Sequence, residues 1–102
     1  LPERIDLRLG LAEALWRLGL DDDAAAICAS ILETHPEAAP ALLFLAEIEH
    51  RRGSVALAGD FARRLRAVDV DGAVVAAAAA AHPRSTIGWL VEDEPAGAGK
   101  LV

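Results

Sequence analysis

The most constraining feature of this sequence is a pattern that returns after 34 residues. The recurring positions are apolar, small, charged or glycine, and the matched pairs are Leu9 and Leu43, Leu11 and Leu45, Ala12 and Ala46, Glu13 and Glu47, Arg17 and Arg51, Gly19 and Gly53, and Ala24 and Ala58. A fixed period of this size is typical of stacked helical repeats, in which each unit buries its apolar face against its neighbours. The sequence therefore predicts a protein that offers a binding or assembly surface.

The composition indicates an all-α chain. Hydrophobic residues make up 54% of the 102 residues, much of this fraction is alanine, and aromatic residues reach only 4%. Alanine is the best helix former, whereas runs of the residues that favour strands are absent from the sequence. A chain of this length is one domain, near the lower limit for a self-sufficient core.

Charge and cysteine usage exclude several classes of function. The net charge of −6 argues against a surface for nucleic acid or anionic lipid, because phosphate binding needs a basic patch. The longest apolar run, residues 73–81, is too short to span a bilayer, so we expect no membrane insertion. The single cysteine, Cys28, has no partner for an internal disulfide and lies in no metal-binding spacing. With no signal peptide in the sequence, this pattern favours the cytoplasm over secretion.

Helical periodicity predicts five helices, at residues 1–18, from residue 22 or 23 to residue 34, and at residues 40–52, 55–68 and 73–81. The first is apolar on more than one side, which predicts that neighbours cover it on two faces. Gly19 and Gly53 suit left-handed helix caps, and Ser54 suits the N-cap of the fourth helix. Small residues at Ala12, Ala24, Ala46 and Ala58 should mark close helix crossings. We divide the chain into a helical-repeat domain, residues 1–82, and a C-terminal cap segment with a flexible tail, residues 83–102.

Two charged clusters have ordinary explanations. Asp21, Asp22 and Asp23 have the spacing of calcium-loop ligands, but the loop glycine and the later glutamate are missing. We therefore expect one aspartate to cap the second helix and the others to oppose its dipole. Three arginines on the fourth helix suit a solvated face better than an anion site.

No catalytic constellation is visible in the sequence. His35, His50 and His82 stand at helix ends without companions for a triad, and tyrosine is absent. We therefore expect no enzyme activity, no cofactor and no metal.

A short apolar island, residues 86–91 (TIGWLV), follows the fifth helix and carries the second tryptophan. About three repeats are needed to bury a continuous core, and the pattern here supplies two and a half. We expect the island either to fold back and cap the helices or to occupy the groove of a neighbouring copy.

Small, large and turn residues in the first repeat together resemble the tetratricopeptide repeat family; they are Leu11, Ala12, Leu15, Ala24, Cys28, Ile31 and Pro36. The resemblance covers residues 5 to about 81, although Glu49 and Val70 depart from the second repeat's pattern. It implies a right-handed α-solenoid of antiparallel helix pairs, with about five helices and a C-terminal tail.

Tetratricopeptide arrays hold a partner segment in a concave groove lined by the first helix of each repeat. By the family's register, the groove positions here are Asp6, Leu9, Gly10, Glu13, Trp16 and Arg17, followed by Leu43, Phe44, Glu47, His50 and Arg51. The carboxylate clamp of one well-known subclass is missing, because the matching positions hold Leu9, Glu13, Phe44 or Glu47, Val74 and Ala78. The resemblance thus implies an adaptor that binds a protein segment with apolar and basic residues. The alternative is a self-assembly or spacer unit that binds copies of itself or the rest of a larger protein.

Overall fold

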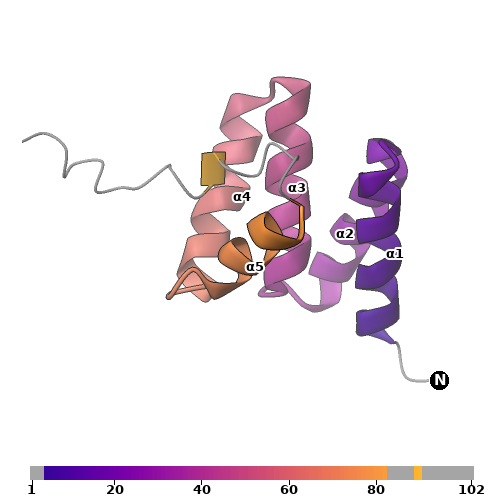
Figure 1. Cartoon of the computed structure of the whole chain (residues 1–102), viewed down its shortest axis with the longest axis horizontal. Helices are drawn as coiled ribbons and strands as arrows, with labels where there is room; N and C mark the ends of the chain where they lie inside the picture. The colour runs from indigo at the N-terminus through magenta and orange to yellow at the C-terminus, as the bar shows by residue number, and fades with distance from the viewer. Residues whose placement is uncertain (1–3, 83–88, 91–102) are drawn as a thin grey trace, which may run out of the picture.

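The computed structural model describes residues 4–82 and 89–90, and within these ranges the chain forms five α-helices and no strand. The helices follow one another through short turns (Figure 1), as α1 (Ile5–Arg17), α2 (Asp21–Thr34), α3 (Ala39–Arg52), α4 (Val55–Val68) and α5 (Ala73–Ala81). The all-α, repeat-type architecture predicted from the sequence is confirmed. The bounds of α4 and α5 agree with prediction, whereas α1 begins at Ile5.

The turns after α1 and α3 share one geometry, and this repeats the 34-residue period in the backbone. Gly19 and Gly53 have φ angles of +83° and +84°, in the region that only glycine adopts cheaply. In the first turn Leu20 N–H bonds Leu15 C=O, and in the second Ser54 N–H bonds Glu49 C=O, both at 2.9 Å. Each of these two bonds spans six residues, as in a Schellman motif, so α1 and α3 end with the same kind of turn.

Helix α3 is the centre of the molecule. Its residues 41–49 are buried without interruption, because α1, α2, α4 and α5 all pack against it. The predicted small positions are confirmed as buried: Ala12, Ala24 and Ala46 have no exposed surface, and Ala58 has 2%. Cys28 is also fully buried on α2, and burial raises the pKa of its thiol to about 12.

The expectation that α1 is covered on two faces is wrong for the described residues. Leu7, Leu11 and Leu18 share one side of α1 and are 61%, 52% and 74% exposed. The equivalent positions of Leu7 and Leu11 in α3 are Ala41 and Leu45, which are buried. The difference arises because α3 follows α2 in the stack, while no described helix covers this side of α1.

The capping prediction for Asp21, Asp22 and Asp23 is also wrong. The three aspartates form the first turn of α2, whose N-cap position is Leu20, and no side chain caps that helix within the described chain. Two of them instead pair with the end of α3: Asp21 Oδ1 accepts a 2.7 Å hydrogen bond from Arg51 Nη2, and Asp22 pairs with Arg52. Ser54 occupies the N-cap position of α4, but its side chain makes no capping hydrogen bond.

Helix α5 lies across the face of α3 and α4 in Figure 1, and its first turn is fixed by a buried aspartate. The Asp69 carboxylate accepts hydrogen bonds from the Val74 and Val75 backbone N–H groups, at 3.0 and 3.2 Å. Asp71 accepts a third, from Ala73 N–H at 3.1 Å. These carboxylates satisfy donors that a helix N-terminus leaves unpaired, so they set where α5 begins and which way it runs.

Candidate functional site: the face of α1 and α3 that carries the predicted groove residues

The predicted groove residues lie on α1 and α3 and differ widely in exposure. Trp16, Leu43, Phe44 and Glu47 are buried, and Leu9 and Glu13 are half-buried. Arg17, His50 and Arg51 are exposed. The buried members therefore form the floor of this face, and the half-buried and exposed members lie at its surface.

An aromatic cluster around Trp16 forms the centre of the face. The Trp16 ring lies 5.2 Å from the Phe44 ring, centroid to centroid, at an angle of 43°. The Arg51 guanidinium is 5.6 Å from the Trp16 ring centre, a cation–π distance. Trp16 thus joins α1 to α3, and its indole Nε1 is buried with no hydrogen-bond partner among the described residues.

Glu47 is a fully buried carboxylate on α3 and the most unusual polar group of the face. Its Oε1 accepts a 2.8 Å hydrogen bond from the indole Nε1 of Trp89, and its Oε2 lies 3.9 Å from Arg51 Nε. That second oxygen has no hydrogen-bond partner in the described part of the chain. Burial raises the pKa of Glu47 above its usual value, while the Trp89 hydrogen bond and the charges of Arg51 and His50 oppose the rise.

Glu13 is the equivalent residue on α1, and it also receives a donor from the C-terminal part of the chain. Its Oε2 lies 2.6 Å from Nε2 of His82, the residue that follows α5. Since an ionised carboxylate only accepts hydrogen bonds, His82 donates through Nε2. The His82 ring also meets the Trp16 ring edge-on, with centroids 4.9 Å apart and planes at 87°.

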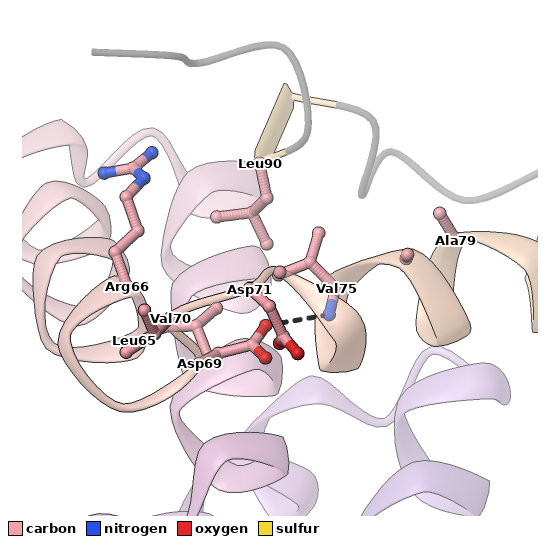
Figure 2. A pocket seen from close by; sticks show the side chains of 10 residues that line it. Leu65, Arg66, Asp69, Val70, Asp71, Val75, Ala79 and Leu90 are labelled. Atoms are coloured by element: carbon pink, nitrogen blue, oxygen red, sulfur yellow. Dashed lines mark hydrogen bonds between the residues drawn. The ribbon is translucent and has the colours of Figure 1, made fainter. Parts of the chain in front are cut away.

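A hollow of about 670 Å³ opens beside this face, between the end of α4 and α5. Figure 2 shows Leu90 directed into it from above and Asp69 and Val70 below. The other side chains around it are largely apolar and include Leu65, Val75 and Ala79. Leu90 is 7% exposed, so this hollow already buries one apolar side chain of the C-terminal segment.

The sequence predicted that the island at residues 86–91, of which the structure describes Trp89 and Leu90, folds back onto the helices or occupies a neighbouring groove, but it did not indicate the contacts that three residues make in this region. Asp69 orients α5, His82 reaches Glu13, and Trp89 reaches Glu47. None of them obeys the 34-residue period, so the repeat pattern carried no signal for them. The clue that was available is composition, because Trp89 is one of only two tryptophans in the chain.

Across residues 4–82 and 89–90, no three His, Cys, Asp or Glu side chains are grouped so as to hold a metal ion. In the same part of the chain, no helix has both the length and the apolar character needed to cross a membrane.

Comparison with known proteins finds one family. A family model described as "Tetratricopeptide repeat" matches residues 5–48, which comprise α1, α2 and most of α3. No curated protein and no solved structure matches the chain.

Proposed function

Because residues 5–48 belong to the tetratricopeptide repeat family, we propose that this chain is an interaction module that holds a segment of another protein against the concave face of α1 and α3. Repeats of this family generally mediate protein–protein contacts or scaffolding and are typically non-catalytic. The finer proposal is that the partner segment carries apolar side chains and N–H donors, basic ones included.

The observation that supports this specificity is the pair of carboxylates on the concave face. Glu13 and Glu47 occupy equivalent positions on successive inner helices, and each accepts a hydrogen bond from an N–H donor. The aromatic floor of Trp16 and Phe44 lies beside them. Carboxylates next to aromatic surface favour a ligand with donors flanked by apolar groups, and they disfavour an acidic tail.

Selection of a random peptide library against the immobilised full-length chain tests this proposal. We expect selected peptides to be rich in Trp, His, Lys and Arg and poor in Asp and Glu. Glu13→Lys should weaken their binding about tenfold or more, because it places a cation where the peptide's donor belongs. Glu33→Lys is the matched control, since Glu33 is exposed on α2 and lies outside the concave face. Equal binding by both variants would reject the concave face as the site.

A self-assembly or spacer role is the second candidate, and the exposed stripe on α1 favours it. Leu7, Leu11 and Leu18 are more than half exposed, while the α3 equivalents of the first two are buried by the stack. Light scattering coupled to size-exclusion chromatography tests this role through the substitution Leu11→Glu. A concentration-dependent dimer that this substitution abolishes would support assembly through α1, whereas a monomer at all concentrations would count against association with copies of itself.

A further inference from the structure

Each repeat of the concave face carries the same two-residue unit, a glutamate followed three residues later by an aromatic ring. The units are Glu13 with Trp16 on α1, and Glu47 with His50 on α3, at the same positions of the 34-residue period. Residues three apart on a helix are neighbours on one side of it. The two members of each unit therefore present a hydrogen-bond acceptor and a ring side by side. We call these the α1 unit and the α3 unit.

Both units hold an N–H-bearing ring from the C-terminal part of the chain. In the α1 unit, His82 Nε2 lies 2.6 Å from Glu13 Oε2, and the His82 ring packs edge-on against Trp16. In the α3 unit, Trp89 Nε1 lies 2.8 Å from Glu47 Oε1, and the Trp89 ring stacks on His50 with centroids 4.3 Å apart and planes within 9°. Each contact thus pairs an N–H donor with the carboxylate and places a ring against the ring of the unit, edge-on in the α1 unit and stacked in the α3 unit, although His82 and Trp89 lie outside the two repeats.

From this correspondence we infer that each repeat is a receptor for one aromatic ring with an N–H donor, and that His82 and Trp89 are intramolecular ligands that a partner must displace. The inference rests on the proposed function and refines it: the partner segment carries two such rings, tryptophan or histidine, and not simply basic residues. A bare aromatic ring leaves the carboxylate without a donor, and a lysine leaves the unit's ring without a stacking partner.

The burial of Glu47 explains why the α3 unit demands a donor. A buried carboxylate without hydrogen bonds is costly, and Arg51 Nε lies 3.9 Å from Glu47 Oε2, too far for a hydrogen bond. The indole N–H of Trp89 offsets that cost while its ring covers the site. Leu90, the next residue, inserts into the hollow between α4 and α5. Consecutive residues therefore anchor the segment at two places, which makes it a competitor for any external ligand.

Occupation of the two units by His82 and Trp89 should change the apparent affinity for an external ligand. A tethered ligand acts at an effective concentration that commonly reaches the millimolar range. An external ligand then binds only the fraction of molecules whose units are empty, so its apparent dissociation constant rises by the inverse of that fraction. Substitutions at His82 and Trp89 should therefore strengthen, and not weaken, the binding of an external segment.

The test uses a fluorescent synthetic peptide with the sequence of residues 79–92 (AAAHPRSTIGWLVE) and the full-length chain. Fluorescence anisotropy compares its binding to the wild-type chain and to the His82→Ala/Trp89→Ala double variant. We expect the double variant to bind the peptide at least about tenfold more tightly. The same peptide with both rings replaced by alanine should lose this binding, as should the double variant carrying Glu13→Lys.

Equal affinity for the wild-type chain and the double variant would overturn intramolecular occupation. Failure of a folded double variant to bind the peptide would overturn the ring receptors themselves. If circular dichroism shows the double variant to be unfolded, Trp89→Phe replaces it, because phenylalanine keeps the ring and removes the N–H donor. Library peptides that need Glu13 but bind wild-type and variant chains equally would reject this inference and leave the proposed function standing.

Discussion

Trp89 Nε1 donates a 2.8 Å hydrogen bond to Oε1 of Glu47, a carboxylate that has no exposed surface and lies 42 residues earlier in the chain. The bond links the second repeat to a segment beyond α5. A buried acceptor of this kind needs a donor, because its hydration has been removed. Residues outside the two repeats thus contact the face that carries the predicted groove residues.

The environment of Glu47 predicts that the difference in stability between the wild-type chain and a Glu47→Gln chain depends on pH. Burial raises the pKa of Glu47 above its ordinary value of 4.5, so the folded state disfavours the ionised form. Between the unfolded and folded pKa values the folded state binds more protons, and stability falls as pH rises through that window. Glu47→Gln keeps an acceptor for Trp89 and removes the charge.

We therefore expect the Glu47→Gln chain to gain stability relative to wild type as pH increases from 4.5 upward, with a plateau once Glu47 is ionised in the folded state. Urea unfolding of both chains at a series of pH values measures this difference. A difference that is constant with pH, or that grows on acidification, would show that the charge on Glu47 is not penalised.

Ala46 tests the close packing of the inner helices. It is fully buried on α3, so Ala46→Leu should lower the free energy of unfolding by about 1–3 kcal/mol through overpacking. Ala14→Leu is the control, because Ala14 is exposed on α1 and a leucine there meets solvent. If both variants unfold at the same urea concentration as wild type, the assigned repeat register is wrong.

Alanine substitutions at two glycines should change the stability of the chain in opposite directions. Gly53 has a φ of +84°, so Gly53→Ala should destabilise the chain by about 1–2 kcal/mol. Gly10 lies inside α1 with no atom within 4 Å of an added Cβ, so Gly10→Ala should stabilise it by about 0.5–1 kcal/mol. Thermal unfolding followed by circular dichroism measures both. Shifts of the same sign would contradict the turn geometry at Gly53.

The repeat pattern predicted most of the helix bounds but not how the ends of the helices interact. Apolar periodicity and the recurring glycines depend on local geometry, which a sequence encodes directly. The pairing of Asp21 with Arg51 depends on the end of α3 lying beside the start of α2, and that placement follows only from the packed stack. The α1 prediction failed for the same reason, since exposure depends on which neighbour is present.

The sequence predicted the positions of the groove residues in the repeat, but it did not predict how buried each one is. Family register named Glu13, Trp16, Glu47 and His50, and these are the residues that contact His82 and Trp89 in the structure. It gave no indication that Glu47 is buried, and Trp89, which donates a hydrogen bond to its carboxylate, lies outside the repeats. A residue's position in a repeat is encoded locally, whereas its accessibility depends on segments that follow a different pattern.

The thiol of Cys28 should react slowly with thiol reagents while the chain is folded. It has no exposed surface, and burial raises the pKa of its thiol to about 12, so little thiolate forms at pH 8. Ellman's reagent should react with one thiol per chain in urea and with almost none in buffer. Rapid reaction of the folded protein would place Cys28 at the surface and contradict the packing of α2.

The indole N–H signals of the two tryptophans give the most direct measurement of the Trp89–Glu47 contact. A ¹⁵N–¹H correlation spectrum of the full chain should show two such signals, and Trp89→Phe assigns them. We predict that the Trp89 signal is protected from exchange with water and shifts strongly in the Glu47→Gln chain, while the Trp16 signal moves little. A Trp89 signal that exchanges like free indole and ignores the Glu47 substitution would contradict intramolecular occupation of the concave face.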